Sequence, residues 1–456
     1  MQRLVEKELI DWKNSDRRKP LMVLGIRQCG KTYTLKEFGR KYYRDVAYFD
    51  FEYMENSANI FRDLDPHRII KELGLIGGKT ITPDTLIIFD EIQKCYPAIT
   101  SLKYFLQDAP EYHVVAAGSL LGVALAERSF ENKDNKKDDT VSEKYSFPVG
   151  KVSFLRMWPM CFGEYVLARA GQTAFDYLDG LGPDETMPEW VMSRMNDLYL
   201  EFLLVGGMPE SVSVWCDTED MGAVRKVQSD IISSYQKDMG KYSGDDYNRI
   251  TQLWRSVAYQ VAEGGDRFNL KKAGGEMRNL RSPIQWLLDA DLVRRCWQVN
   301  GASVPPMPRG GIFFKLYYPD VGLLSCQAGL DFKVISSSDK SSSGIRGALA
   351  ENFVLNELSY ALGIDGDFHY WAREKGESEV DFQLQFHRDI VPVEVKSGNV
   401  NNMPSLKMYC DTYSPKAAFV ISKKNVRMGS AEEYTFVPLY MVWKFGMYAG
   451  ALGLDV

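Results

Sequence analysis

The chain has 456 residues, of which 45% are apolar and 25% are charged, and its formal net charge is −6. This length is too great for one compact core, so we expect two or three domains, and the composition is typical of a soluble globular protein. The acidic balance excludes a global basic field that would bind nucleic acid without specificity, although a local basic face remains open.

The cysteines and the apolar stretches indicate in which cellular compartment the protein is located. The seven cysteines form no CxxC or CxH cluster and there are four histidines, which favours reduced thiols over a disulfide framework or a zinc site. The charged N-terminal stretch MQRLVEKELIDWKN does not resemble a signal peptide. The longest apolar stretch, 13 residues from Val114, is too short to cross a bilayer. We therefore expect a cytoplasmic protein without a membrane segment.

The first 150 residues alternate between strand and helix patterns, and the strands are runs of nearly continuous apolar residues. Such runs, separated by helices, indicate an α/β fold with a parallel sheet covered on both faces. Asp65 is a suitable N-cap because Pro66 follows it at the first helical position. The expected strands are residues 20–26, 45–52, 85–92 and 112–119, and the expected helices are residues 31–43, 66–73 and 101–109.

The pattern changes after this first part. Residues 129–146 are dense in Lys, Asp, Glu and Asn, so we expect a solvated surface loop there. A helical stretch follows, and residues 247–300 then read as helix, helix, helix and strand, the order of a winged helix-turn-helix. The last part mixes helices with alternating strands. The expected domains are a nucleotide-binding core (1–150), a helical lid or connector (151–245), a winged helix (246–310) and a C-terminal α/β domain (311–456).

The stretch GIRQCGKT carries the clearest chemistry, because Gly25 is followed after four residues by Gly30, Lys31 and Thr32. Glycines let the backbone N–H groups surround a phosphate chain, and the next helix directs its positive end at the same phosphates. Lys31 would reach the β- and γ-phosphates of ATP, and Thr32 would place its hydroxyl on Mg²⁺. The expected nucleotide-binding residues are Gly25, Ile26, Arg27, Gln28, Cys29, Gly30, Lys31 and Thr32.

Two later strands complete this P-loop NTPase site. LIIFDEIQ ends in Asp90 and Glu91, where Asp90 can join the Mg²⁺ shell and Glu91 can polarise the attacking water. Ser119, at the end of HVVAAGS, is expected to sense the γ-phosphate or orient that water, against the alternative of a plain strand end. Cys29 is interpreted as a small filler, with redox control of the loop as an alternative hypothesis.

An arginine from a neighbouring subunit completes the site in many oligomeric ATPases, so a homo-oligomer is one expectation. Arg128, Arg156 and Arg255 are the candidates for this role. Surface or structural roles are the alternative for each of them, and the sequence does not choose between them.

These motifs resemble the prokaryotic AAA-type P-loop ATPases that carry a C-terminal domain of unknown function. The resemblance rests on GIRQCGKT, FDEIQ and GSLLG, and it extends through PVGKVSFLRMWPMCFGEYV, VGGMPESV, YQKDM, KLYYPDVGLL and GALAENFVLNEL, over roughly residues 15–420. It implies an AAA core, a winged helix and a tail with a restriction-endonuclease-like fold. The charged stretch at 129–146 departs from the family pattern.

The tail has its own set of candidate residues. Glu394 and Lys396 are two apart on a strand and therefore face the same side. If Asp381 lies on the neighbouring strand, Asp381 and Glu394 could hold one Mg²⁺, with Glu351 in support and Lys396 as the catalytic residue that orients a water at a phosphodiester. Two interpretations stay open, an active metal-dependent nuclease and a retained fold that binds a protein partner.

A basic cluster lies within the expected winged helix, formed by Arg267, Lys271, Lys272, Arg278 and Arg281, with Asp266 and Glu276 opposing it. It could bind DNA phosphates, or the element could instead be a lid that packs on the ATPase core. The functional hypothesis is a Mg²⁺-dependent ATP hydrolase whose nucleotide state controls the winged helix and the tail, acting on or near DNA. The alternative is a slow ATPase switch whose inactive tail binds a protein partner.

Overall fold

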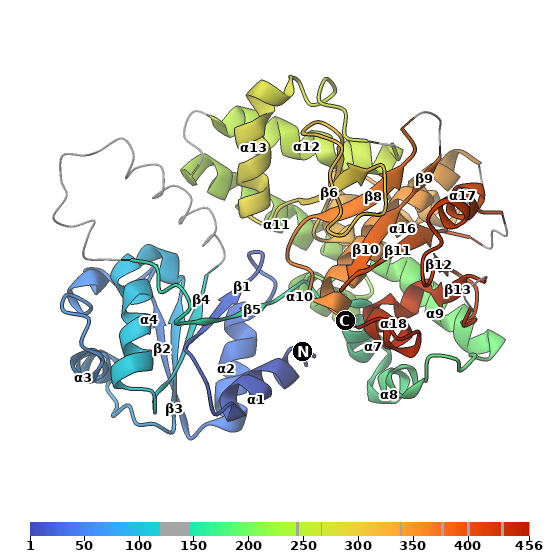
Figure 1. Ribbon diagram of the computed structural model, residues 1–456. Coiled ribbons are helices and arrows are strands. Elements are labelled where there is room, and N and C mark those ends of the chain that lie inside the picture. Colours follow the sequence, from blue (N-terminus) through green and yellow to red (C-terminus); the bar gives the residue numbers. More distant parts are fainter. Residues whose placement is uncertain are drawn as a thin grey trace. The chain divides into compact units, whose positions relative to one another are not determined.

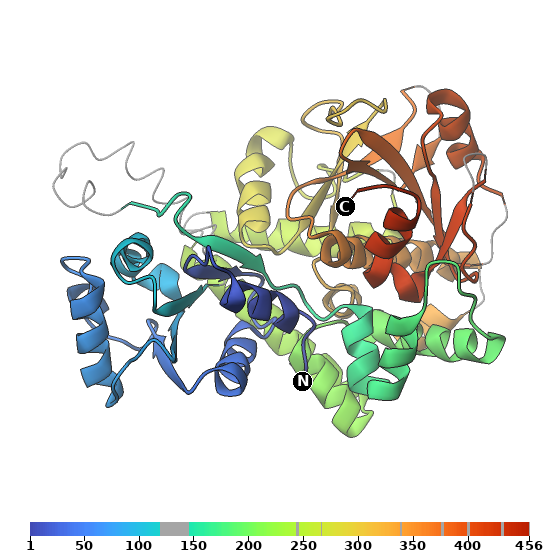
Figure 2. The same ribbon diagram turned by 60° about the horizontal axis from the view of Figure 1, so that its bottom comes forward.

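The computed structural model describes residues 1–118, 146–242, 246–265, 267–337, 340–374, 378–398, 402–429 and 433–455. These residues divide into two compact units, Arg3–Trp158 and Pro159–Val456, the second of which also includes Met1–Gln2. Figures 1 and 2 show the elements of both units. Apart from Ser146, the loop expected at 129–146 lies outside the described residues.

The first unit is built on one parallel sheet of five strands, in the order β2-β3-β4-β1-β5 (Figure 1). This confirms the expected α/β fold with a parallel sheet. β5 follows residue 150, where we expected the core to end, and it pairs with β1. The strands are β1 Leu21–Leu24, β2 Asp45–Asp50, β3 Thr85–Asp90, β4 His113–Ala117 and β5 Ser153–Arg156.

Helices cover both faces of this sheet because the strand side chains alternate. Ile87 and Phe89 of β3 belong to one buried cluster with Leu73 and Leu102 of two helices, whereas Gly39 of another helix lies against Leu86. Asp65 accepts a hydrogen bond from the N–H of His67, which confirms the expected N-cap. The helices are α1 Glu6–Asn14, α2 Lys31–Tyr42, α3 Pro66–Gly77 and α4 Tyr96–Asp108, with the 3₁₀ turns η1 Ser57–Asn59 and η2 Ile92–Lys94.

The second unit begins with a helical part and continues into two mixed sheets. The helical part comprises α7 Phe162–Ala170, α8 Gln172–Gly180, α9 Glu189–Val205, α10 Pro209–Thr218, α11 Met221–Tyr242, α12 Tyr247–Glu263 and α13 Met277–Asp289. Where we expected two helices after α12, the described residues form the single helix α13. Its first turn lies in the stretch where we expected a separate short helix. Pro283 lies inside α13, which continues through the buried residues Leu280, Ile284 and Leu287.

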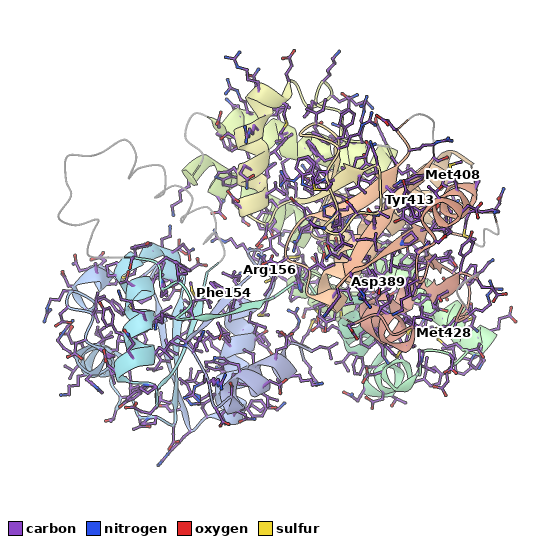
Figure 3. All side chains as sticks on the ribbon, viewed as in Figure 1. Phe154, Arg156, Asp389, Met408, Tyr413 and Met428 are labelled. Atoms are coloured by element: carbon purple, nitrogen blue, oxygen red, sulfur yellow. The ribbon has the colours of Figure 1, made fainter. Side chains whose placement is uncertain are left out.

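The two sheets have four strands each, in the orders β7-β6-β8-β9 and β10-β11-β12-β13. Their strands are β6 Arg294–Val299, β7 Phe314–Tyr317, β8 Phe368–Ala372, β9 Glu379–Val380, β10 Phe382–Phe386, β11 Asp389–Val395, β12 Phe419–Ser422 and β13 Thr435–Pro438. The remaining helices are α14 Val321–Gln327, α15 Phe332–Ser336, α16 Lys340–Leu362, α17 Pro404–Tyr413 and α18 Phe445–Ala451, with the 3₁₀ turn η4 Leu439–Lys444. Figure 3 labels Met408 and Tyr413 on α17.

β6 lies between β7 and β8, antiparallel to the first and parallel to the second. The strand that we expected in a winged helix is thus shared with residues of the C-terminal segment. Cys296 and Val299 of β6 are fully buried within this sheet. The expectation that the segment from α12 to β6 forms a winged helix therefore stays a prediction.

Two buried carboxylates join distant motifs inside the second unit. Asp320 accepts hydrogen bonds from the N–H groups of Gly207, at 2.6 Å, and Leu323, at 2.8 Å. Glu357 accepts from the N–H of Phe162 at the start of α7, at 3.0 Å. These contacts connect the stretches VGGMPESV with KLYYPDVGLL, and FGEYV with GALAENFVLNEL. No helix among the described residues is long and apolar enough to cross a membrane.

Candidate functional site

The phosphate loop lies between β1 and α2, and its backbone conformation suits the sequence. Gly25 has φ +143° and Gly30 has φ +95°, values that side chains other than hydrogen rarely accommodate. A Cβ atom added to Gly25 would lie 2.1 Å from the carbonyl oxygen of Met157. Cys29 is fully buried, and its Sγ lies 3.5 Å from the same oxygen. The loop is therefore packed directly on the chain segment that follows β5.

Lys31 and Thr32 open α2 at the head of this loop. Lys31 is 7% exposed, and its Nζ donates to the carbonyl oxygens of Gly25, at 2.7 Å, and Ile26, at 2.9 Å. Thr32 Oγ1 donates to Asp90 Oδ2 at 2.6 Å. The structure thus brings the loop and the end of β3 into direct contact, as a nucleotide site of this type requires.

Asp90 has a second partner that the sequence did not point to. Tyr48 on β2 donates its hydroxyl to Asp90 Oδ2 at 3.0 Å, and the parallel register places Asp50 opposite Asp90. Burial, and then the charge of Asp90, raise the pKa of the Tyr48 hydroxyl well above its ordinary value. Tyr48 therefore stays protonated and orients the Asp90 carboxylate.

Glu91 follows directly, with φ +49°, a left-handed conformation that costs a non-glycine residue energy. Burial raises the pKa of its carboxyl group, and a hydrogen bond from Gln93 Nε2 acts in the opposite direction. Gln93 Oε1 is buried without a hydrogen-bond partner and lies close to Gly118, the residue after β4. Ser119, the expected sensor of the γ-phosphate, lies outside the described residues, as does Arg128.

The oxygen atoms at the end of β3 suit a hard divalent cation. A hydroxyl and a carboxylate oxygen 2.6 Å apart are the ligand types that Mg²⁺ prefers, because it is bound through a few protein oxygens together with substrate phosphates. Thr32 and Asp90 are therefore the residues that would hold Mg²⁺ with ATP.

In the tail, Asp381, Glu394 and Lys396 come together at one end of β11. Asp381 lies between β9 and β10, and its Oδ2 accepts a hydrogen bond from the N–H of Val395 at 2.6 Å. Lys396 Nζ donates to Glu394 Oε1, while Glu394 Oε2 is buried without a hydrogen-bond partner. Burial and the charge of Glu394 raise the pKa of Asp381 well above its ordinary range.

Glu351 is held by other groups. Lys315 of β7 donates from Nζ to Glu351 Oε1, at 2.9 Å, and to Glu379 Oε1, at 2.5 Å, and Tyr317 also donates its hydroxyl to Glu351. Burial lowers the pKa of Lys315, but Glu351, Tyr317 and Glu379 outweigh it, so the amine is charged. No group of three or more acidic, histidine or cysteine side chains is arranged to hold a metal ion within the described ranges. Glu351 thus accepts its hydrogen bonds from Lys315 and Tyr317, and the supporting role at a metal ion that we expected for it stays a prediction.

Sequence reasoning missed Lys315, Tyr48 and Gln93. Lys315 lies in KLYYPDVGLL, which the family resemblance had singled out, but only the pairing of β6 with β7 and the packing of α16 bring it to Glu351. Gln93 follows Asp90 and Glu91 in FDEIQ, so its proximity was the signal that could have identified it.

The basic cluster is exposed, and one member is already paired. Arg267, Lys271, Lys272, Arg278 and Arg281 all lie on the surface. Lys272 Nζ lies 2.5 Å from Glu263 Oε2, and the Arg267 guanidinium lies over the Phe313 ring. A pocket lined by Gln260, Arg267, Lys315 and Glu351, among others, connects this region with the charged groups of the tail.

The comparisons with known proteins identify domains rather than an activity. A family model for an AAA domain matches residues 17–166, and models for two domains of unknown function, DUF8612 and DUF4143, match residues 196–333 and 346–442. The DUF8612 match runs across the boundaries that we expected at 245 and 310. A comparison with curated proteins gave no match.

Three solved structures are weakly similar. PCH-2 of C. elegans is 10% identical, with 48% of this chain and 60% of that chain covered and a TM-score of 0.22. AMPPCP-bound DnaA from Aquifex aeolicus is 13% identical, with 63% and 75% covered and a TM-score of 0.23. The Aeropyrum pernix Orc1 protein in complex with DNA is 12% identical, with 71% and 90% covered and a TM-score of 0.25.

This chain spans 60% of the length of PCH-2. The family matches confirm the resemblance that the motifs suggested. This chain carries an AAA domain at residues 17–166, which contains the phosphate loop and Asp90, and a DUF4143 domain at residues 346–442.

Proposed function

We propose that the AAA domain binds ATP with Mg²⁺ and hydrolyses it, and that the nucleotide state controls what the second unit binds. The observation that carries the proposal is the 2.6 Å hydrogen bond between Thr32 Oγ1 and Asp90 Oδ2. It joins the start of α2 to the end of β3, which supports one shared site for the two motifs of the sequence. Glu91, with its raised pKa, is the adjacent acid–base group.

Each residue has a distinct role in this proposal. The N–H groups of residues 25–30 and the Lys31 ammonium bind the phosphates. Thr32 and Asp90 hold Mg²⁺, which when bound neutralises charge that develops on the phosphates. Glu91 accepts the proton of the water that attacks the γ-phosphorus, and the bond to the β-γ bridging oxygen breaks to give ADP and phosphate. Gln93 orients the Glu91 carboxylate through its amide N–H.

The test compares three variants for ATP binding and turnover. Lys31→Ala should lose nucleotide binding, because it removes the ammonium that lies at the loop carbonyls of Gly25 and Ile26. Glu91→Gln should bind ATP normally and hydrolyse it at least about a hundredfold more slowly. Lys41→Ala removes an exposed lysine of the same helix that pairs with Glu6, and it should behave like the wild type. Normal hydrolysis in Glu91→Gln would remove Glu91 from the role of base.

A second candidate function concerns the tail. The buried Glu394 Oε2 without a partner, beside Asp381, supports a cation-binding pair, because a divalent cation would satisfy both carboxylates. We propose that Asp381 and Glu394 hold such a cation and that Lys396 orients the water that attacks a phosphodiester. Glu351 is held by Lys315 and lies near enough for its charge to act on Asp381 and Glu394, so its supporting role stays a prediction.

Incubation of DNA with the protein and Mg²⁺ tests this second function. Cleavage should appear with the wild type, disappear in Lys396→Ala and persist in Lys407→Ala, which removes an exposed lysine paired with Asp411. Mg²⁺ should also raise the melting temperature of the wild type more than that of Glu394→Gln. If neither effect appears, this second candidate function is refuted and the alternative hypothesis of a protein-binding tail is favoured.

The basic cluster of α12 to α13 supports DNA as a ligand of the second unit. ATP turnover measured with and without single- and double-stranded DNA tests this, and a salt-dependent stimulation is the expected result. Turnover that DNA does not change, at any salt concentration, would favour a protein partner instead.

A further inference from the structure

Arg3 is a buried cation, and two hydrogen bonds of its guanidinium join distant parts of the first unit. It is 5% exposed. Its Nη1 donates to the carbonyl oxygen of Cys29, in the phosphate loop, at 2.8 Å, and its Nη2 donates to the carbonyl oxygen of Trp158 at 2.8 Å. A planar guanidinium can make two such bonds in fixed directions at once, whereas an ammonium is a point charge on a flexible stem.

The residues that Arg3 joins have a special place in the chain. Arg3 and Trp158 are the first and last residues of the AAA-containing unit, so the chain enters and leaves the unit at this hydrogen bond. Figure 3 labels Phe154 and Arg156 on β5, the strand that leads to Trp158. The Arg156 guanidinium lies over the Trp158 ring, 5.2 Å from its centroid.

The segment before Trp158 also forms the support of the phosphate loop. Met157 N–H donates to Leu24, the last residue of β1, at 2.8 Å, and its carbonyl oxygen lies against Gly25 and Cys29. The carbonyl of Cys29 is part of the peptide bond to Gly30, the residue before Lys31. A movement of the loop on binding phosphate therefore acts on residues 157 and 158 through Arg3 and through direct packing.

Only Pro159 separates Trp158 from Met160, which is hydrogen-bonded within the second unit. Met160 N–H donates to the carbonyl oxygen of Gly207 at 2.6 Å, and the N–H of Gly207 donates to the buried carboxylate of Asp320. The ring of Pro159 fixes one of the two backbone torsions of this residue, φ. The connection between the units is thus short and held at each end within its own unit.

We infer that Arg3 is a positioning residue that sets the shape of the phosphate loop and couples nucleotide binding to the connector at residues 157–160. This inference rests on the proposed function, because it requires that the loop binds ATP. The Arg3 guanidinium holds the Cys29 carbonyl in the loop conformation that receives phosphate, and it transmits a change of that conformation to Trp158. Arg3 touches neither the phosphates nor the attacking water in this scheme.

The experiment combines kinetics with hydrogen exchange on the full chain. Arg3→Ala should raise the KM for ATP about tenfold and leave kcat within about twofold, because the loop is shaped less well before binding. In the wild type, the non-hydrolysable analogue AMPPCP should slow amide exchange in the peptide that contains residues 157–160 by roughly threefold or more. In Arg3→Ala, saturating AMPPCP should slow exchange in that peptide by less than half as much as in the wild type, because only the direct packing of Met157 against Gly25 and Cys29 remains.

Two further variants keep the result interpretable. Arg18→Ala is the matched control, because Arg18 also donates to two backbone carbonyls of this unit, those of Lys13 and Pro110, away from the loop. It should retain the wild-type KM and exchange response. Arg3→Lys keeps a buried cation but not the fork, so it should show the same loss of response as Arg3→Ala, and it carries the test if Arg3→Ala does not fold.

The outcomes distinguish a failure of the inference about Arg3 from a failure of the proposed function. If AMPPCP slows exchange at residues 157–160 equally in the wild type and the Arg3 variants, the coupling role of Arg3 is refuted while ATP binding stands. If the wild type binds AMPPCP without any change at these residues, the coupling is likewise refuted. If the wild type binds no nucleotide, the proposed function fails and this inference fails with it.

Discussion

The substitution Gly25→Ala tests whether the phosphate loop needs close contact with the segment after β5. The added Cβ would lie 2.1 Å from the carbonyl oxygen of Met157, far inside van der Waals contact. That carbonyl belongs to the backbone rather than to a flexible side chain, and Met157 is held by the hydrogen bond from its N–H to the Leu24 carbonyl at 2.8 Å. Either the loop or the end of β5 must move.

The cost follows from two contributions. A non-glycine residue at an unusual positive φ costs about 1–3 kcal/mol. Loss of the Met157–Leu24 hydrogen bond adds about 1 kcal/mol. We therefore expect Gly25→Ala to destabilise the first unit by about 2–4 kcal/mol, which for a domain of this size lowers the melting temperature by roughly 4–16 °C. Affinity for ATP should fall in parallel because the phosphate-binding N–H groups are displaced.

Gly78→Ala provides the matched control. Gly78 also has a positive φ, +63°, at the end of α3, but an added Cβ would meet no atom within 4 Å. This variant should cost about 1 kcal/mol from backbone conformation alone and should bind ATP like the wild type. Thermal unfolding and binding of a fluorescent ATP analogue measure both effects. A Gly25→Ala variant that is no less stable than Gly78→Ala and binds ATP normally would refute the reasoning.

Three further predictions concern charged groups. Gln93→Ala should move the acid limb of the kcat–pH profile to higher pH, because it removes the hydrogen bond that lowers the pKa of Glu91; an unmoved limb would separate Gln93 from that carboxylate. Burial raises the pKa of Asp320 to about 6 from 3.8, so folding stability should decline by about 3 kcal/mol as pH rises across this window. Denaturant titrations of the wild type and Asp320→Asn check this, since the variant should lose that decline. Lys315→Ala should destabilise the second unit by about 3–5 kcal/mol, because Glu351 and Glu379 are left without their shared cation; denaturation unchanged from the wild type would contradict this.

Much of the AAA domain could be predicted because its chemistry is local in sequence. The phosphate loop needs Gly25, Gly30 and Lys31 at fixed spacing between a strand and a helix, and the structure has β1 and α2 at those places. Asp65 was recognisable as a cap because its partner, His67, is two residues away. The near-continuous apolar run before Asp90 indicated a strand buried on both faces, and β3 is buried throughout.

The tertiary structure decided the contacts that depend on strand register and on packing between distant segments. Nothing near Arg3 in sequence indicates Cys29 or Trp158, and nothing near Lys315 indicates Glu351 or Glu379. Likewise, helix–strand order suggested a winged helix, which stays a prediction, and only the fold shows that β6 pairs with both β7 and β8. The sequence by itself indicated where the proposed ATP phosphates would bind, since that needs only short-range geometry. Long-range folding decided which charges surround the tail carboxylates. It also decided which residue, Arg3, joins the phosphate loop to Trp158, where the chain leaves the first unit.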